Sequence, residues 1–151
     1  MSSTPFSTNS SLMNQEILVL VISPNKSLFD SVTEGVLAFS GSVRVLQRAT
    51  VSEALELFER LDLVSGNIQI YLDSKSFKAD AQTFVRQMDR DFKGVSRRSV
   101  ILIDDASSIA SLVSLAIAEC VGDVLNYPVL STEVETAIHK QFPQLRASVH
   151  S

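Results

Sequence analysis

Residues 68–80 read IQIYLDSKSFKAD, a mostly apolar run of strand-forming residues that stops at Asp73, with a second acid, Asp80, seven residues further on. Aliphatic and aromatic side chains in a short run, bounded by turn-forming residues, are typical of a strand. A nearly continuous apolar run is typical of a strand that is covered on both faces. The stretch therefore predicts a buried strand that ends at a carboxylate.

Four other short runs share this composition, and segments with helical spacing separate them. The five predicted strands are Ile17–Ile22, Val43–Gln47, Ile68–Leu72, Ser99–Ile103 and Asp123–Tyr127. The apolar residues at helical spacing are Leu28, Val32 and Val36, then Leu55, Phe58 and Leu61, then Phe84, Val85, Met88 and Phe92. Strands that alternate with helices need crossover connections, which produce a parallel sheet covered on both faces. We therefore expect a three-layer α/β domain with the first, third and fourth strands at its centre.

Local signals mark several helix ends. Thr50 with Glu53, and Thr132 with Glu135, have the spacing of a capping box, in which a hydroxyl and an acid satisfy backbone donors at a helix start. Gly41 is expected just after a helix end, where a positive φ costs glycine little.

Size and composition limit the class of protein. A chain of 151 residues with 45% apolar content has length for one ordinary domain. We expect a flexible N-terminal tail over residues 1–14, a domain over 15–142, and a C-terminal tail or linker over 143–151. The sequence shows neither a signal peptide nor a membrane span, which predicts a cytoplasmic protein.

Charge and cysteine content exclude further classes. The net charge of −4 gives no general attraction to nucleic acid. Cys120 is the single cysteine, so the chain alone forms neither a disulfide nor a cysteine-based metal site. His139 and His150 lie away from the strand-end acids, which argues against a nucleophile–base pair.

The sequence resembles the receiver domains of response regulators over nearly all of residues 16–142. The resemblance is carried by Asp73 and Asp80, which match the family's phosphoacceptor and the acid seven residues later, and by GDVLNYP (122–128), which matches the family's fifth strand with its proline. It implies the flavodoxin-like (CheY-like) strand order 2-1-3-4-5.

Departures from the family pattern fall on the phosphorylation site. The acid pair that holds the divalent cation in the family maps to Ile22 and Ser23 or to Ser23 and Pro24, neither of which supplies a carboxylate. Tyr127 replaces the family's lysine, and Asp104 replaces the hydroxyl residue that closes the fourth strand. The degenerate pocket then comprises Ser23, Asn25, Asp104, Asp105 and Tyr127 around Asp73.

Three interpretations of this pocket stay open. Asp73 and Asp104 are solvated strand-end acids with Asp105 or Ser107 capping the next helix, or they hold a cation themselves, or Asp73 accepts phosphate in an atypical receiver. A different class is a flavodoxin-like nucleotide or flavin binder that uses SPNKS (23–27), although Asn25 also suits a plain helix cap.

The segment SSIASLVSLAIAEC (107–120) is the strongest candidate for an interaction surface. Its helical spacing places Ile109, Leu112, Val113 and Ala116 toward the sheet, and no charge appears before Glu119. A stripe of small side chains flanked by one leucine runs along the other side and would allow another helix to approach closely: Ser107, Ser111, Ser114, Leu115 and Ala118. The resemblance points to the same surface, because the family dimerises and contacts its output through the fourth helix, fifth strand and fifth helix.

The sequence therefore predicts a pseudo-receiver, a phosphorylation-independent signalling domain without catalytic activity and without a cofactor or resident metal. It would bind a protein partner or a second copy of itself, and a fused output domain in a longer chain is expected.

Overall fold

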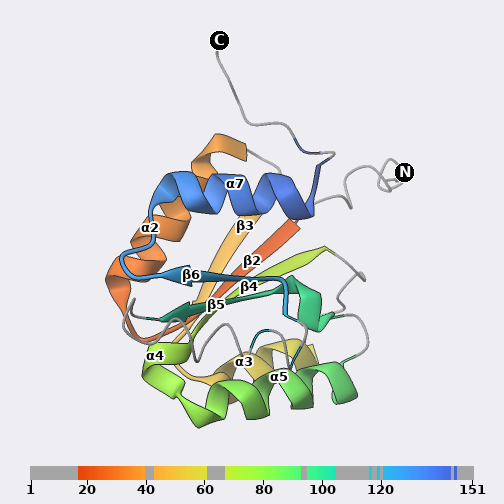
Figure 1. The fold of residues 1–151 in the computed structure, drawn as a ribbon. Helices are drawn as coiled ribbons and strands as arrows, with labels where there is room; N and C mark the ends of the chain where they lie inside the picture. The colour runs from red at the N-terminus through yellow and green to blue at the C-terminus, as the bar shows by residue number, and fades with distance from the viewer. Residues whose placement is uncertain are drawn as a thin grey trace, which may run out of the picture.

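The computed structural model describes residues 17–39, 43–60, 67–92, 95–104, 116, 119, 121–143 and 145. The five strands are β2 (Ile17–Ile22), β3 (Val43–Arg48), β4 (Ile68–Asp73), β5 (Val100–Asp104) and β6 (Asp123–Asn126). All neighbouring strands pair in parallel, in the order β3-β2-β4-β5-β6 (Figure 1). In strand numbering this is 2-1-3-4-5, and the expected doubly wound sheet is confirmed.

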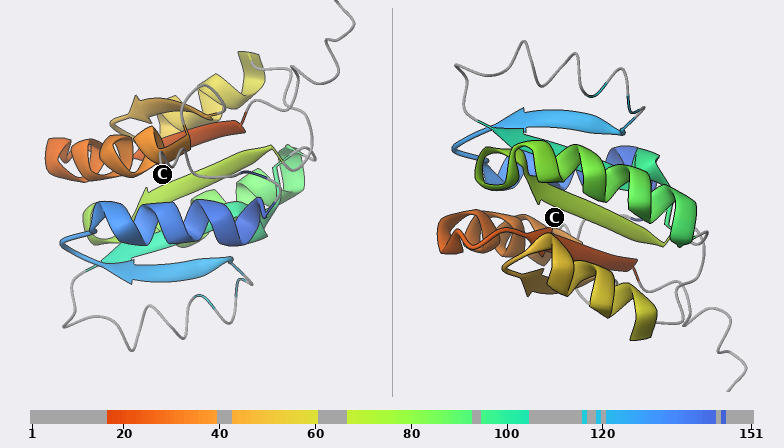
Figure 2. Two further views of the ribbon diagram at one scale, coloured as in Figure 1. Left: turned by 90° about the horizontal axis from the view of Figure 1, so that it is seen from above. Right: turned by 90° about the horizontal axis from the view of Figure 1, so that it is seen from below.

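Helices cover both faces of the sheet and give it three layers. The described helices are α2 (Lys26–Val36), α3 (Val51–Arg60), α4 (Ser74–Phe77), α5 (Ala79–Asp91) and α7 (Ser131–Gln141), with two 3-10 turns, η1 (Leu37–Phe39) and η2 (Arg97–Ser99). Helices α2 and α7 lie on one face, and α3 and α5 lie on the other, as the views from above and below show (Figure 2). None of the helices in the described ranges is long and apolar enough to cross a bilayer.

Burial follows the position of each strand in the sheet. Every residue of β4 is buried, and β2 is buried at all positions except Leu18. The two outer strands, β3 and β6, contain no fully buried residue. Continuous apolar runs thus occupy the centre, where both faces are covered by helices.

Helices α2 and α7 approach each other closely at one glycine. A Cβ atom on Gly35 would lie 2.6 Å from the Val134 Cβ and 2.7 Å from the Ser131 carbonyl oxygen. The absence of a side chain at Gly35 therefore allows the two helices to pack side by side over the same face of the sheet.

The strand limits differ from the predicted ones by one residue. Strands β3, β4 and β5 each include one further residue at the carboxyl end, namely Arg48, Asp73 and Asp104. Ser99 belongs to η2 instead of β5, because the Ser96 hydroxyl and carbonyl accept hydrogen bonds from the Arg98 and Ser99 amides and close a turn there. Tyr127 follows β6, and its peptide bond to Pro128 is cis.

Two of the predicted helix caps are confirmed and one is wrong. Asn25 caps α2 through its side-chain oxygen, which accepts from the Ser27 amide at 2.9 Å. The Thr50 hydroxyl accepts from the Glu53 amide at 3.1 Å, and the Glu53 carboxylate accepts in turn from the Ala49 amide.

The third cap differs because α7 begins at Ser131, one residue before Thr132. The acid that accepts a backbone amide at this helix start is Glu133, with Leu130 as donor at 3.0 Å. The predicted cap of Thr132 with Glu135 is therefore wrong, and the observed cap of Leu130 with Glu133 lies two residues earlier. Gly41 and Leu61 lie outside the described residues.

Candidate functional site

The carboxyl edge of the sheet brings together three of the side chains that the sequence singled out. Ser23 directly follows β2, Asp73 ends β4, and Tyr127 directly follows β6. These are separate strands of one parallel sheet, so their carboxyl ends meet at one edge. Ser23 is completely buried and Asp73 is 1% exposed, so the acid at the centre of this edge lies in the protein interior.

Four hydrogen bonds reach the Asp73 carboxylate, and all of the donors are neutral. One oxygen, Oδ2, accepts from the Ser23 hydroxyl at 2.5 Å, the Ser76 hydroxyl at 2.8 Å and the Tyr127 hydroxyl at 2.8 Å. The other, Oδ1, accepts from the Ser76 amide at 3.1 Å, which makes Asp73 the N-cap of α4. A buried carboxylate requires hydrogen bonds to offset its lost hydration, and hydroxyl groups supply them here.

The loop between β2 and α2 holds Ser23 in its orientation. The Ser23 amide donates to the Arg48 carbonyl at 2.9 Å, and the Ser23 carbonyl accepts from the Gln47 side chain at 2.9 Å. The Ser23 hydroxyl oxygen accepts from the Asn25 amide at 2.9 Å while its proton points to Asp73. With Asn25 also capping α2, the polar groups of SPNKS that face inward already have protein partners.

Tyr127 stays protonated at this edge. Burial raises the pKa of Tyr127 above its ordinary value, and the hydrogen bond to Asp73 and the negative charge of Asp73 raise it further. The Lys75 ammonium lies 5.4 Å from the centre of the Tyr127 ring, within the range of a cation–π contact. Tyr127 is therefore a neutral hydrogen-bond donor where the resembled family has a positively charged lysine.

Asp104 lies at the same edge but one step out of phase with Asp73. The register pairs Asp73 with Ile103, and Asp104 with Asn126. Successive residues of a strand point to opposite faces of the sheet. Asp104 is therefore on the opposite face from Ile103 and from its neighbour Asp73. Asp104 is half-buried, and Asp105 lies outside the described residues.

The resembled family implies a divalent cation, and the residues around Asp73 do not fit one. Magnesium sites draw on carboxylates and keep several waters. Here the groups that contact Asp73 are three hydroxyls and an amide, each oriented as a donor toward the carboxylate. The described part of the chain contains no cluster of three or more acids, histidines or cysteines able to hold a metal ion.

The predicted interaction stripe lies outside the described residues: Ser107, Ser111, Ser114, Leu115 and Ala118. Two other residues of that segment are described. Ala116 packs against the core cluster of α3 and α5, as its spacing predicted. Glu119 is 3% exposed and was not expected to be buried.

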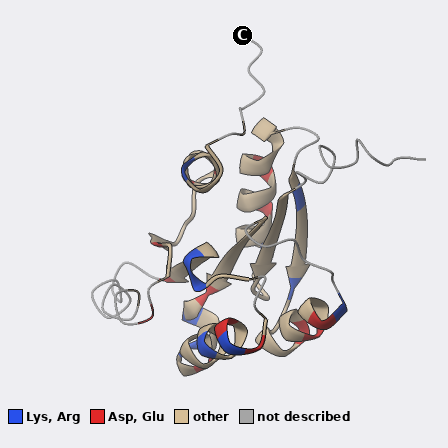
Figure 3. Cartoon of the chain, turned by 90° about the vertical axis from the view of Figure 1, so that its right-hand side faces the viewer, with Lys and Arg blue, Asp and Glu red and all other residues tan. Residues whose placement is uncertain are grey.

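Glu119 joins its segment to α5 and η2. Its carboxylate accepts from the Arg86 guanidinium at 2.9 Å and the Gln82 amide at 3.0 Å, and its carbonyl accepts from Arg97 at 3.2 Å. Hydrogen bonds from Arg86, and to a smaller extent from Gln82, hold the pKa of Glu119 below its ordinary value. The sequence signal for these Glu119 contacts was a lone acid at the end of an apolar segment. Figure 3 shows both acidic and basic residues on the helices of this face.

A second polar network, also unanticipated, lies inside the opposite layer. Gln69 is 1% exposed in the middle of β4, and its amide donates to the Ala137 carbonyl at 3.1 Å and the Gln141 side chain at 2.9 Å. The Tyr71 hydroxyl donates to the Gln69 oxygen at 2.7 Å. A glutamine inside an apolar strand was the only sequence signal for it.

Comparisons with known proteins identify the fold. No family model matches the sequence, and no curated protein matches it. Among solved structures, a response regulator from Thermotoga maritima aligns with a TM-score of 0.69 and 13% identity, over 85% of this chain and 99% of that chain. A response-regulator receiver domain protein from Clostridium thermocellum aligns with a TM-score of 0.65 and 18% identity, over 85% and 95%.

A third neighbour comes from a different biological setting. It is described as a pilus assembly protein, CpaE, from Burkholderia thailandensis, and it aligns with a TM-score of 0.61 and 21% identity, over 85% of this chain and 99% of that chain. At these identities the likeness concerns architecture alone. The chain has the CheY-like fold of response-regulator receiver domains.

Proposed function

We propose that this chain is a phosphorylation-independent signalling domain, a pseudo-receiver that regulates other proteins by binding them and has no catalytic activity of its own. The observation that carries the proposal is the environment of Asp73. Its carboxylate is buried and accepts four hydrogen bonds from neutral donors, with Ser23 and Tyr127 at the positions that match the acid pair and the lysine of the resembled family.

Phosphoryl transfer to Asp73 is opposed by this arrangement. A phosphoryl group brings negative charge that metal ions and basic side chains must neutralise. Neither Ser23 nor Tyr127 carries a positive charge or supplies an acid that could hold a cation. Attachment at Oδ2 would also displace three hydroxyl donors, each of which contributes on the order of 1 kcal/mol.

We infer that function instead lies on the surface formed by segment 107–120, β6 and α7. The small-residue stripe of that segment stays a prediction, since its members lie outside the described residues. Support for a binding role comes from the fold itself, which occurs in response regulators and in a protein described as a pilus assembly protein. The partner would be another protein, a second copy of this chain, or an output domain on a longer chain, in a cytoplasmic setting.

The phosphate test uses acetyl phosphate, or beryllium fluoride as phosphate mimic, each with magnesium, and follows the amide spectrum by NMR. We expect no saturable shift around Asp73. A designed variant, Ser23→Asp with Tyr127→Lys, restores an acid and a lysine and serves as the matched comparison, with circular dichroism to check folding. Saturable shifts in the natural sequence that disappear in Asp73→Asn would replace the proposal with an atypical receiver phosphorylated at Asp73.

The association test places a long charge in the stripe. Ser114→Arg or Ala118→Glu is expected to abolish self-association or partner binding, measured by sedimentation, while circular dichroism stays unchanged. Normal association by both folded variants would contradict the surface assignment. A purified protein that carried bound flavin or nucleotide would favour the flavodoxin-like binder instead.

A further inference from the structure

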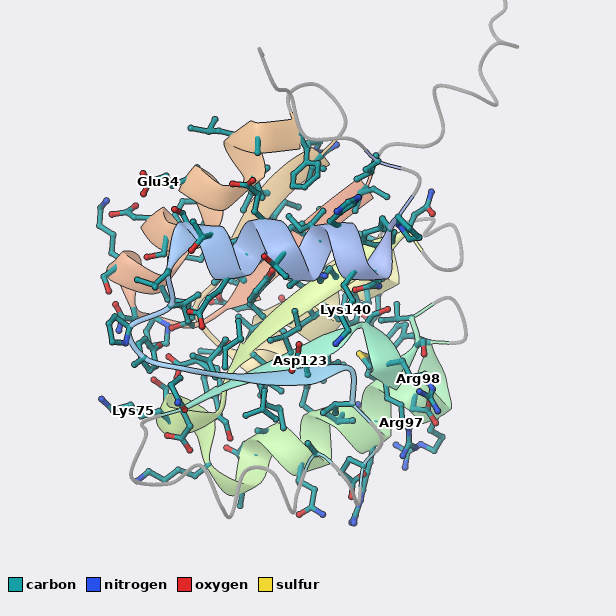
Figure 4. All side chains as sticks on the ribbon, turned by 45° about the horizontal axis from the view of Figure 1, so that its top comes forward. Glu34, Lys75, Arg97, Arg98, Asp123 and Lys140 are labelled. Atoms are coloured by element: carbon teal, nitrogen blue, oxygen red, sulfur yellow. The ribbon has the colours of Figure 1, made fainter. Side chains whose placement is uncertain are left out.

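A pocket of about 210 Å³ opens between α7 and the amino-terminal ends of β5 and β6, at the opposite end of the sheet from Asp73. We call it the α7–β6 pocket. Gln69 and Gln141 line its inner wall, and its charged lining residues are Arg98, Asp123 and Lys140. Figure 4 shows Lys140 and Asp123 pointing toward each other between α7 and β6, with Arg98 to one side and Lys75 of the Asp73 site far across the molecule.

The amide donors of the inner wall are already used. Gln69 donates to the Ala137 carbonyl and to Gln141, and Gln141 donates to the Ile68 carbonyl at 2.9 Å and to the Ser99 hydroxyl at 3.2 Å. These amides connect β4, η2 and α7, and both donors of each amide have a protein partner. The donors left for a ligand are the ammonium group of Lys140 and the guanidinium group of Arg98.

The two cations differ in how they are engaged. Lys140 lies 3.9 Å from the Asp123 carboxylate, and the two side chains are 73% and 42% exposed. Such a long, solvated ion pair is weak and exchanges readily. Arg98 forms no salt bridge with any residue in the described ranges, whereas its neighbour Arg97 is paired with Asp89 at 2.8 Å. Within the described part of the chain, the pocket therefore offers one loosely paired cation and one cation without a salt bridge, on an acidic protein of net charge −4.

We propose that the α7–β6 pocket binds the carboxylate of an acidic side chain presented by a partner protein. The planar fork of Arg98 matches a carboxylate, and Lys140 already pairs with one on the pocket's own rim, Asp123. The charged lining sums to one positive charge, which suits a single carboxylate better than a doubly charged phosphate. The proposal rests on the proposed function, because it names the chemistry of a partner for the β6 and α7 part of that surface.

The geometry of the wall beside Arg98 supports a defined site. A Cβ atom on Gly122 would lie 2.2 Å from the Arg98 carbonyl oxygen, so the chain segments before β5 and β6 touch at this glycine. The Gly122 amide donates to the Val100 carbonyl at 2.9 Å. The backbone that carries Arg98 is thus held against the backbone that carries Asp123.

The experiment titrates a short glutamate-rich peptide, its glutamine-rich counterpart and free succinate into the full chain, and follows backbone and glutamine side-chain amides by NMR. We expect saturable shifts at Gly122, Asp123 and Gln141 with the glutamate peptide alone. Arg98→Gln and Lys140→Gln should each weaken binding about tenfold. Lys26→Gln, which removes an exposed lysine on α2, should leave binding unchanged.

Asp123→Asn provides the sharpest comparison, because it removes the carboxylate that competes for Lys140. We expect it to tighten peptide binding about two- to fivefold, the reverse of the two cation variants. Equal binding of the glutamine peptide, or full binding by the Arg98 and Lys140 variants, would overturn the pocket assignment. Equally tight binding of succinate would overturn the assignment to a protein partner. Phosphorylation at Asp73 would overturn the proposed function only. The peptide titrations with the Arg98, Lys140 and Asp123 variants decide the pocket assignment independently of it.

Discussion

The Tyr127 hydroxyl donates a hydrogen bond of 2.8 Å to the Asp73 carboxylate and so joins the segment after β6 to the end of β4 across the intervening strand β5. The same carboxylate oxygen binds Ser23, which follows β2. One buried acid therefore connects three of the strand ends at the carboxyl edge. These hydrogen bonds place the Ser23 and Tyr127 hydroxyls against the Asp73 carboxylate from both sides of the strand order.

Removal of the Tyr127 hydroxyl should destabilise the domain. Tyr127→Phe leaves the ring and its contact with Lys75 but removes one of four hydrogen bonds to a buried carboxylate. We expect the free energy of unfolding to fall by about 1–2 kcal/mol, measured by urea denaturation. Lys75→Gln, which removes the cation–π contact and keeps the hydroxyl, should cost less than 1 kcal/mol. An unchanged stability in Tyr127→Phe would mean that Asp73 does not depend on this donor.

The two tyrosines of the sequence should resist alkaline titration. Burial raises the pKa of Tyr71 and of Tyr127 above the ordinary value near 10, and for Tyr127 the hydrogen bond to Asp73 adds to this. The folded state then holds protons that the unfolded state releases. This contribution to stability is complete below about pH 10 and decreases as the pH rises above it.

The measurement is tyrosinate absorbance near 295 nm against pH, with circular dichroism in parallel. Both tyrosines should ionise together with unfolding and not before it. A tyrosine that ionises near pH 10 in the folded protein would contradict the burial of that hydroxyl.

Much of the fold could be predicted from the sequence, because apolar periodicity reports burial directly. All five strands were located to within one residue, since each run of aliphatic side chains is bounded by turn-forming residues. The end of β4 at Asp73 was visible because a carboxylate interrupts the apolar run. The displaced cap of α7 shows where this fails. Glu133 and Glu135 are both close to the helix start, and only the backbone path decides which one meets a free amide.

The members of the site could be predicted only in part. Ser23, Asn25 and Tyr127 lie around Asp73 as expected, whereas Asp104 alternates away from Asp73 and Asp105 lies outside the described residues. The expectation of solvated acids was wrong for Asp73, which is buried, because hydrogen bonds from distant residues such as Ser23 and Tyr127 replace its hydration. Contacts that join residues 50 or more positions apart leave no local pattern. The burial of Glu119 leaves no local pattern either, because its partner Arg86 lies 33 positions earlier, on α5.

Neutralising Glu119 should test the connection between its segment and α5. Glu119→Gln keeps the shape and weakens the hydrogen bonds from Arg86, and we expect a loss of about 1–2 kcal/mol, limited because Arg86 is 63% exposed. Glu56→Gln, at an exposed position on α3, should change stability by less than about 0.5 kcal/mol.

The pH dependence gives Glu119→Gln a second readout. Hydrogen bonds from Arg86 and Gln82 lower the pKa of Glu119 in the folded state. The contribution of the Glu119 charge to the free energy of unfolding is present above the ordinary glutamate pKa near 4.5. It is lost as the pH falls through the lower pKa of the folded state. The difference in unfolding free energy between the natural sequence and Glu119→Gln should therefore shrink below about pH 4.5. A difference that stayed constant down to pH 2 would show that the charge of Glu119 is not involved.

Lys78, between α4 and α5, offers a substitution that should stabilise the protein. Its φ of 51° and ψ of −120° lie in a region that L-residues with a Cβ rarely adopt and that glycine adopts freely. Glycine relieves this strain but adds conformational entropy to the unfolded chain. The relief of strain should be the larger effect, so Lys78→Gly should raise the free energy of unfolding by about 0.5–1 kcal/mol. Lys78→Ala is the matched control, because it removes the same charge and side chain but keeps the Cβ, and it should give no gain. Thermal unfolding of both variants measures the difference, and equal stabilities would show that the backbone at Lys78 is not strained.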